Sequence, residues 1–109
     1  MSARYILRRS GTQFYWNFFA VNGEIILTSE RYVSKQGAEG GIASCRTHSP
    51  HDQYYARLTS TAAQPYFTLR AANYEPIGAS EMYSSIAARE AGIVSCKANG
   101  PSAPTVDQT

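Results

Sequence analysis

The chain contains one segment twice. Residues 15–50 return without a gap as residues 66–101, at a constant offset of 51 positions. Identical residues at matching positions are Tyr15 and Tyr66, Ala20 and Ala71, Asn22 and Asn73, Glu24 and Glu75, Ile26 and Ile77, Ser29-Glu30 and Ser80-Glu81, Tyr32 and Tyr83, Ser34 and Ser85, Glu39 and Glu90, Gly41-Ile42 and Gly92-Ile93, Ser44-Cys45 and Ser95-Cys96, and Pro50 and Pro101. Chance does not give so many identities in one register, so each copy is predicted to be one supersecondary unit that buries its apolar face against the other.

The length of the chain fits a single domain with internal pseudo-twofold symmetry. We predict one domain over residues 1–101, with repeat one at 1–50 and repeat two at 51–101. A unit of about 50 residues lies near the size at which an independent core becomes marginal, so the two halves should fold only together. We therefore expect a monomer built as a pseudo-dimer. Residues 102–109 are polar and lack an apolar period, which predicts a disordered tail.

Composition sets limits on the class of protein. Hydrophobic residues make up 43% of the chain, as in globular domains, and no apolar run approaches the roughly 20 residues that a membrane helix needs. The N-terminal segment lacks the pattern of a secretory signal, so we expect a soluble cytoplasmic protein with reduced thiols. The net charge of +2 is too small to indicate nucleic-acid binding by itself.

Residues favouring strands precede those favouring a helix in both repeats. Aromatic and β-branched residues predict strands at 5–9, 13–21 and 24–29, and again at 54–59, 64–72 and 75–80. Positions that stay apolar in both copies indicate a buried set of Trp16, Phe18, Ala20 and Ile26. A three-residue loop with Gly23 in the left-handed region would place Ile26 opposite Phe18. The second copy has Tyr74 at that loop position, so we expect its turn to differ.

A helix is predicted after the third strand of each repeat. Ser34 and Ser85 are good N-caps, and Pro50 and Pro101 mark the helix ends. Gly41 and Gly92 should allow helix and sheet to approach closely. The apolar stripes that cover the sheet are Ala38, Ile42 and Cys45 in the first copy, and Ile86, Ile93 and Cys96 in the second. The predicted fold class is α+β, with two tandem β-β-β-α repeats forming one antiparallel sheet and two helices on one face.

These segments resemble the YegP-like family. The residues that carry the resemblance are Ala71-Ala72-Asn73, Ile77-Gly78, Ser80-Glu81-Met82-Tyr83-Ser84-Ser85 and Gly92-Ile93, with the tandem copies Val21-Asn22-Gly23-Glu24-Ile25-Ile26 and Ser29-Glu30-Arg31-Tyr32. The resemblance implies tandem β-β-β-α repeats in one sheet, with a strand exchanged between the halves. Departures from the family pattern are Cys45, Cys96 and the segment 74–76. The biochemical role of the family is not established, so the resemblance implies a fold and little chemistry.

The repeated Ser-Glu-x-Tyr motif is the first candidate site. Glu30, Tyr32, Glu81 and Tyr83 lie where strand gives way to helix, and a doubled carboxylate and phenol could bind a ligand or move protons. The alternative is structural: each Glu would accept backbone hydrogen bonds at the turn, and each Tyr would pack beside its helix.

The cysteines and histidines are the second candidates. Cys45 and Cys96 occupy matching helix positions, where a redox couple, a metal pair or a disulfide competes with simple burial as small hydrophobic residues. His48 and His51 flank Ser49-Pro50 in the linker between the repeats, and Asp52 follows. A metal or acid-base site there would need a third converging group, which the sequence does not show. A solvated linker is the preferred interpretation.

The open face of the sheet is the third candidate. It should carry Tyr15, Asn17 and Phe19 in one repeat, and Tyr66, Thr68 and Arg70 in the other. Aromatic and basic residues there could stack bases or dock a protein, whereas ordinary cross-strand pairing is the structural alternative. Nucleic-acid binding requires Arg8, Arg9 and Arg70 to converge beside Tyr15 and Tyr66.

The functional expectation is a non-catalytic binding or interaction module, with no cofactor and no metal. RNA binding through the open sheet face is one alternative, and a redox protein or other enzyme that uses the paired cysteines or glutamates is another. The partner, whether protein or RNA, is left open by the sequence.

Overall fold

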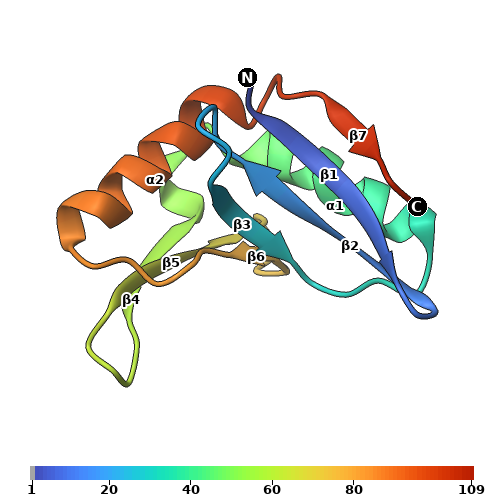
Figure 1. Ribbon diagram of the computed structural model, residues 1–109. Coiled ribbons are helices and arrows are strands. Elements are labelled where there is room, and N and C mark those ends of the chain that lie inside the picture. The colour runs from blue at the N-terminus through green and yellow to red at the C-terminus, as the bar shows by residue number, and fades with distance from the viewer. Residues whose placement is uncertain (1) are drawn as a thin grey trace.

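A computed structural model of the chain describes residues 2–109, and it is one curved sheet covered by two helices (Figure 1). Repeat one contributes β1 (Arg4–Ser10), β2 (Gln13–Phe19), β3 (Ile25–Ser29) and α1 (Lys35–His48). Repeat two contributes β4 (Tyr55–Thr59), β5 (Pro65–Arg70), β6 (Pro76–Ala79) and α2 (Ile86–Asn99), followed by β7 (Thr105–Asp107). A short 3₁₀ turn, Asp52–Tyr54, precedes β4. The predicted order of two β-β-β-α units is confirmed.

The two three-stranded units meet at β3 and β6. The strand order is β4-β5-β6-β3-β2-β1-β7, and the six strands of the repeats pair antiparallel as predicted. At the centre Thr28 lies opposite Ala79, and these two residues are separated by the repeat offset of 51 positions. A residue paired with its own repeat equivalent marks the pseudo-twofold axis. The axis therefore runs through the β3-β6 junction.

The β2-β3 hairpin shows both a correct and a wrong register prediction. The three-residue loop is present, with Gly23 at φ 87° and the Ala20 N–H donating to Glu24 O at 2.9 Å. A bulge then places Leu27 opposite Phe18, where Ile26 was predicted. Because the bulge adds one residue to β3, Ile26 and Leu27 are both buried.

The second hairpin repeats this turn, so the expectation that it differs is wrong. Tyr74 takes φ 68° in the place of Gly23, and the Ala71 N–H donates to Glu75 O at 2.9 Å. A left-handed tyrosine costs about 1 kcal/mol or more. The same bulge puts Gly78 opposite Leu69, where it equals Leu27 of the first copy. A Cβ on Gly78 would lie 2.9 Å from Thr28 O, so glycine permits the close approach of β6 to β3.

Both helices begin as predicted and contribute to one core. The hydroxyls of Ser34 and Ser85 accept hydrogen bonds from Gly37 N and Ala88 N, each at 3.0 Å. Side chains from both repeats form a single buried cluster that includes Trp16, Phe18, Ala20, Ala38, Ile42, Cys45, Phe67, Leu69, Ile93 and Cys96. The prediction fails at Ile86, which is the first residue of α2 and is exposed. Neither 14-residue helix of the described chain has the length and apolar content to cross a bilayer.

A glycine in each helix makes room for a tyrosine ring. A Cβ on Gly41 would collide with the Tyr32 hydroxyl and lie 2.8 Å from Tyr32 Cζ. A Cβ on Gly92 would meet Tyr83 in the same way, at 2.9 Å from its Cζ. The close approach expected at these glycines is therefore made by the tyrosines that follow β3 and β6, whose rings fill the gap between helix and sheet.

The C-terminal segment is ordered, which corrects the prediction of a disordered tail over residues 102–109. β7 pairs in parallel with β1, and Ala103 is buried. The Tyr5 N–H donates to Pro104 O and the Gln108 N–H to Leu7 O, both at 2.8 Å, while Lys35 forms an ion pair with Asp107. The side chains of β7 are exposed, so the sequence shows no apolar period here. Backbone hydrogen bonds to β1 hold this strand in place. β7 makes the sheet mixed, and it is the strand that crosses from repeat two to repeat one.

Removing residues 102–109 should open the β1 edge of the sheet. The Tyr5 amide loses its acceptor at Pro104, so its hydrogen exchange should become much faster while the Phe18 amide, inside the sheet, changes far less. Exchange measured by NMR in the full and shortened chains checks this. Equal protection of Tyr5 in both chains would contradict the role of β7.

Two adjacent glycines in α1 offer a matched test of packing. Gly40→Ala adds a methyl into open space and should stabilise the fold by up to about 1 kcal/mol through helix propensity. Gly41→Ala should instead destabilise it by about 1–3 kcal/mol, because Tyr32 must move. Urea denaturation of both variants measures the difference. A stabilised Gly41→Ala variant would show that the tyrosine site is loosely packed.

Candidate functional site

The serine of the repeated Ser-Glu-x-Tyr motif makes its structural contacts. The Ser29 hydroxyl accepts from Trp16 N at 2.9 Å and donates to Glu30 O at 2.8 Å. Ser80 does the same with Phe67 N at 2.9 Å and Glu81 O at 2.8 Å. Each serine thus closes the bulged hairpin across the sheet. Sequence reasoning had assigned this anchoring to the glutamates, although Ser29 and Ser80 were themselves repeat identities.

The glutamates and tyrosines of the motif separate in space. Glu30 and Glu81 are exposed, and within residues 2–109 their side chains form no hydrogen bond or ion pair, so the backbone-accepting role expected for them is wrong. Tyr32 and Tyr83 pack half-buried beside the helices, as the structural interpretation predicted. Burial, with the charges of Cys96, Glu24 and Glu81, raises the pKa of Tyr83 to about 12. Its hydroxyl is therefore protonated at neutral pH.

Cys45 and Cys96 are free thiols enclosed in the core where the two helices meet. A hydrogen bond with Cys96, and burial, raise the pKa of the Cys45 thiol. Two tyrosine hydroxyls lie nearby: Tyr5 donates to Gly100 O at 2.6 Å, and Tyr55 donates to Ser49 O at 2.7 Å. Thiol chemistry needs access to the thiolate, which this enclosure denies. The cysteines are packing residues beside a polar junction.

His48 has a structural role that the solvated-linker interpretation missed. Its Nδ1 lies 2.8 Å from Ser44 O, and its Nε2 accepts from Ala72 N at 3.2 Å. The neutral tautomer with a proton on Nδ1 satisfies both contacts. His48 therefore ties α1 to the β5-β6 loop, while His51 is exposed as expected. In the described part of the chain, no group of three or more His, Cys, Asp or Glu residues could hold a metal ion.

The open face of repeat one gathers arginines around aromatic rings. We call Arg4, Arg8 and Arg31, with Tyr15 and Phe19, the arginine patch. The Arg31 guanidinium lies 4.5 Å from the Tyr15 ring centre, and that of Arg4 lies 4.8 Å from the Phe19 ring centre. Arg8 is the cross-strand neighbour of Tyr15, and its Nε is buried without a hydrogen-bond partner in residues 2–109. Asn17, between the two rings, donates to Thr28 Oγ1 at 2.9 Å.

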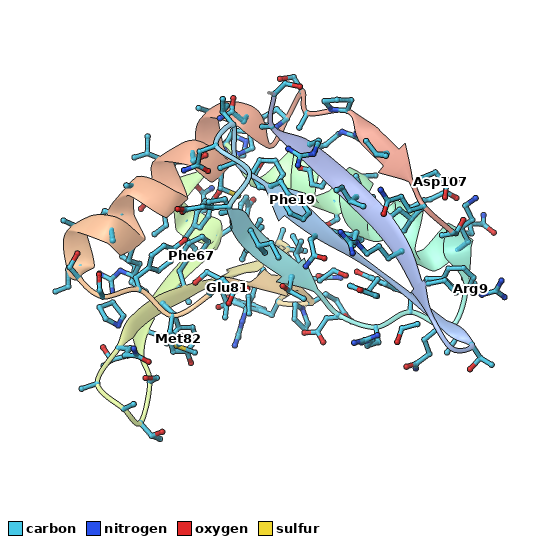
Figure 2. All side chains as sticks on the ribbon, viewed as in Figure 1. Arg9, Phe19, Phe67, Glu81, Met82 and Asp107 are labelled. Carbon is cyan, nitrogen blue, oxygen red and sulfur yellow. The ribbon has the colours of Figure 1, made fainter. Side chains whose placement is uncertain are left out.

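The predicted convergence of Arg8, Arg9 and Arg70 is only partly right. Arg9 lies on the opposite face, 5.2 Å from the Phe14 ring centre, at the end of the β1-β2 hairpin (Figure 2). Arg70 is on β5 and separated from β2 by β6 and β3, a span of roughly 14 Å across three strand spacings. Arg4 and Arg31 take the places predicted for Arg9 and Arg70. Arg4 is opposite Phe19 in the β1-β2 pair, and Arg31, just after β3, lies over Tyr15.

The open face of repeat two is mostly apolar by contrast. Leu58 lies opposite Tyr66 in the β4-β5 pair, and Thr68 and Arg70 follow along β5. Met82, at the repeat position of Arg31, is half-exposed in the loop after β6, next to Glu81 (Figure 2). The two patches predicted as one surface are therefore chemically different: Tyr15 belongs to a cationic half, and Tyr66 to an apolar half with one arginine.

Two clefts at matching positions separate the hairpin of one repeat from the helix of the other. The α2 cleft, about 500 Å³, lies between the β2-β3 hairpin and α2 and is lined by Ala20, Val21, Asn22, Glu24, Ile26, Tyr83, Ala88, Ala91, Gly92 and Ser95. The α1 cleft, about 330 Å³, lies between the β5-β6 hairpin and α1 and is lined by Tyr32, Gly37, Gly40, Gly41, Ser44, Ala71, Asn73, Glu75, Pro76 and Ile77. Nine positions correspond at the repeat offset, and seven of them hold the same residue in both clefts. These identities are visible in the sequence, but the sequence does not show that each cleft combines the hairpin of one repeat with the helix of the other.

Comparison with known families matches both repeats to one model. The domain of unknown function DUF1508 matches residues 10–56 and again residues 60–107. The second match includes β7, in agreement with its ordered structure.

Similar proteins cover the chain almost completely. A UPF0339 protein of Bordetella pertussis is 53% identical over 109 residues, which is 100% of this chain and 98% of that protein. The UPF0339 protein YegP of Escherichia coli K12 is 48% identical over 102 residues, or 94% and 93% of the two chains. The solution NMR structure of a UPF0339 protein from Shewanella oneidensis has a TM-score of 0.91 at 47% identity, with 98% of this chain and 92% of that chain covered. The solution NMR structure of Escherichia coli YegP has a TM-score of 0.93 at 46% identity, covering 100% and 95%.

Burial of the cysteines leads to a direct test with a thiol reagent. Both thiols should react very slowly with dithionitrobenzoate in the native protein and rapidly in denaturant, because unfolding must expose them first. The native labelling rate should follow global opening as urea is added. Rapid labelling of either cysteine in the native protein would contradict the packing role and revive the redox hypothesis.

Proposed function

Since the chain belongs to the UPF0339/YegP family, with the DUF1508 unit present twice, and that family has no known function, we propose a function from geometry. The protein is a non-catalytic binding module whose arginine patch binds single-stranded nucleic acid. The observation that carries the proposal is a row of three arginines on one face of the sheet that form no ion pair within residues 2–109: Arg8 and Arg31 lie beside Tyr15, and Arg4 lies over Phe19, about 13 Å further along β1.

The distribution of ion pairs supports an anionic partner. On the helix side of the described chain, ion pairs with Asp107, Asp52 or Glu90 are formed by four of the six cations, Lys35, Arg57, Arg89 and Lys97, and not by Arg9 and Arg46. Within residues 2–109, Arg4, Arg8 and Arg31 form no ion pair with a carboxylate. A chain with a small net charge thereby presents unneutralised positive charge on its open sheet face. Phosphate groups are suited to such guanidiniums because each can accept paired hydrogen bonds.

The flat groups of the patch support single strands over duplexes. The guanidinium groups of Arg31 and Arg4 lie over the Tyr15 and Phe19 rings and are thereby held near the sheet. Unpaired bases stack on arginine planes and aromatic rings, whereas the bases of a duplex are already stacked. The apolar half around Leu58, Tyr66 and Met82 extends the same face beyond the patch. An acidic protein surface is the competing partner, but it would not use the stacking geometry.

A non-catalytic role is supported by the separation of reactive groups. The thiols are enclosed, and Glu30 and Glu81 lie at opposite ends of the β3-β6 junction without contacts that would place them in a common site. General acid-base catalysis requires such groups to converge on one substrate.

The RNA proposal predicts salt-dependent binding of a mixed-sequence, fluorescein-labelled 12-nucleotide RNA. Three phosphate contacts on a single strand give a slope of about −2 in a plot of log K against log salt concentration. Arg31→Gln should weaken binding several-fold and reduce the magnitude of the slope by about 0.7. Fluorescence anisotropy at about 25 to 200 mM salt measures the affinity and the slope for both proteins.

Arg9→Gln is the matched control for that experiment. Arg9 is also exposed, carries the same charge and lies over a neighbouring ring of β2, but on the opposite face of the sheet. Its loss should leave binding nearly unchanged. Equal weakening by the two variants would indicate diffuse charge attraction, and absence of RNA binding at low salt would overturn the proposal.

A further inference from the structure

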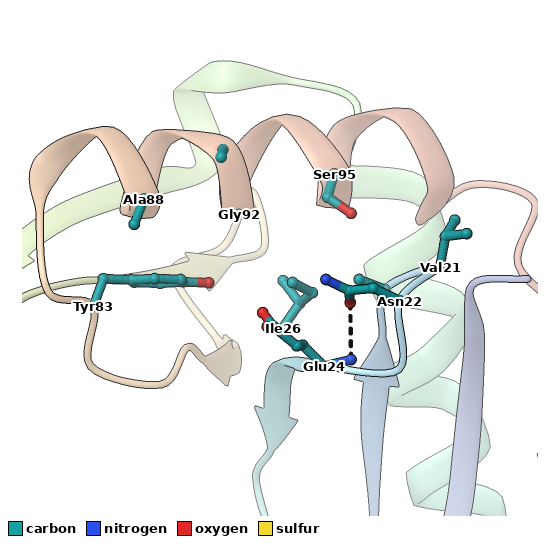
Figure 3. A pocket seen from close by; sticks show the side chains of 10 residues that line it. Val21, Asn22, Glu24, Ile26, Tyr83, Ala88, Gly92 and Ser95 are labelled. Atoms are coloured by element: carbon teal, nitrogen blue, oxygen red, sulfur yellow. Dashed lines mark hydrogen bonds between the residues drawn. The ribbon is translucent and has the colours of Figure 1, made fainter. Parts of the chain in front are cut away.

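The α2 cleft brings polar groups of both repeats around an apolar floor (Figure 3). Glu24 and Asn22 come from the β2-β3 hairpin of repeat one, while Tyr83 and Ser95 come from repeat two. Figure 3 shows the Tyr83 ring lying beneath α2 with its hydroxyl directed toward Ile26 and Glu24, and Ser95 pointing toward Asn22. Asn22 is already used through Oδ1, which accepts from Glu24 N at 3.0 Å. The site is therefore assembled only when the repeats pack together.

The Tyr83 hydroxyl has no partner in the described chain. It is a buried oxygen without a hydrogen bond within residues 2–109, which native proteins usually avoid because an unsatisfied buried hydroxyl is destabilising. The surroundings of the two tyrosines differ. Tyr32 lies beside the Trp16 indole nitrogen, which itself has no hydrogen-bond partner within residues 2–109, whereas Tyr83 stacks on Phe67, which has no polar atom. Repeat two thus keeps the tyrosine and has a phenyl ring in place of the neighbouring indole.

The electrostatic surroundings of Tyr83 are negative. Burial contributes most to the raised pKa of its hydroxyl, followed by the charges of Cys96, Glu24 and Glu81, and no cation in residues 2–109 opposes them. Within residues 2–109, Glu24 forms no ion pair. Glu24, Tyr83 and Ser95 face the cleft from both sides and offer oxygen atoms that can accept hydrogen bonds, while Asn22, whose Oδ1 is used, offers only its Nδ2 donor group. A ligand that donates several hydrogen bonds and carries positive charge is complementary to this arrangement.

The α1 cleft has the same acceptors in a tighter form. Tyr32, Glu75 and Ser44 stand at the matching positions. There His48 bridges Ser44 O and Ala72 N and so ties α1 to the β5-β6 hairpin. Its repeat equivalent, Asn99, donates to Ser95 O at 3.2 Å within α2 and does not reach the β2-β3 hairpin. The helix wall also changes from Gly37 and Gly40 to Ala88 and Ala91, so that methyl groups line the larger cleft. The two clefts thus share a design, but the α1 cleft is smaller, about 330 Å³ against about 500 Å³.

We propose that the α2 cleft binds a small organic amine, with its ammonium group held by the Glu24 carboxylate and the Tyr83 hydroxyl. The apolar body of the amine lies against Ile26, Ala88 and Ala91. A small shift of the Tyr83 ring toward the cleft brings its hydroxyl, buried in the unliganded protein, to the ammonium, so that it accepts a hydrogen bond and is no longer unsatisfied. The α1 cleft does not bind the amine, because it is smaller, its helix is tied to the hairpin by His48, and it lacks the methyl groups of Ala88 and Ala91. This site is separate from the arginine patch, and neither proposal depends on the other.

NMR titration of the full chain with 2-phenylethylamine tests the proposal, with 2-phenylethanol as the uncharged analogue. The amine at up to about 10 mM, a range suited to a fragment of this size, should shift the amide signals of Val21, Ala88, Gly92 and Ser95. The signals of Gly37, Gly41 and Ala71 around the α1 cleft should not move. Glu24→Gln should weaken binding about tenfold or more, since it removes a charge-assisted contact. The alcohol should bind at least tenfold more weakly than the amine.

The repeat supplies a matched control for each variant. Glu75→Gln and Tyr32→Phe make the same changes at the α1 cleft and should leave amine affinity unchanged. Tyr83→Phe removes only an unsatisfied hydroxyl, so it should lower amine affinity several-fold without lowering stability in urea denaturation. Shifts at both clefts, equal affinity for amine and alcohol, or no shifts with the amine would each overturn the proposal.

Discussion

Two buried hydrogen bonds join the ends of the helices to the sheet, and the rest of the fold is organised around them. Tyr55 reaches back to Ser49 O, only six residues earlier, at the end of α1. Tyr5 makes the equivalent bond to Gly100 O at the end of α2, across 95 residues of sequence. The N-terminal strand therefore does for the second helix what β4 does for the first. Because buried helix carbonyls need partners, neither repeat could satisfy its helix end in this way without the strand arrangement that joins them.

The sequence was sufficient where a structural element is determined by local chemistry. Ser34 and Ser85 were identified as caps from residue type alone, and Gly23 was assigned to a left-handed loop position because few other residues accept it. The buried set on β2 followed from comparing the two copies position by position. The same comparison left Leu27 out of the buried set because its equivalent is Gly78. Both positions are buried, and the glycine permits close contact of β3 with β6. Residues that are identical in both repeats occupy equivalent places in the structure, but a position whose residue differs between the repeats can still be buried.

Features made by distant segments were beyond sequence reasoning. β7 is held by backbone hydrogen bonds to β1, which leave no periodic pattern in Thr105–Asp107. The arginine patch combines residues of β1 with Arg31 from the loop after β3, and the strand register that brings them to one face could not be read from the sequence. The clefts join a hairpin of one repeat to the helix of the other, so their lining residues are scattered along the chain. A clue was present, since Asn22, Glu24 and Tyr32 return in the second copy, but identity alone did not reveal which copy each would face.

The pairing of Thr28 with Ala79 on the pseudo-twofold axis has a consequence for how such a chain could arise. A single unit would end in an unpaired β3 edge able to receive the same edge of another molecule, and the extent of that association would depend on concentration. Joining two copies in tandem makes the encounter intramolecular, with an effective concentration of about millimolar for a short connection. It also frees the two halves to diverge, since a substitution need no longer suit both partners at once. Covalent fusion thus converts a symmetric association between two chains into one within a single chain, which can carry different chemistry on each side of its axis.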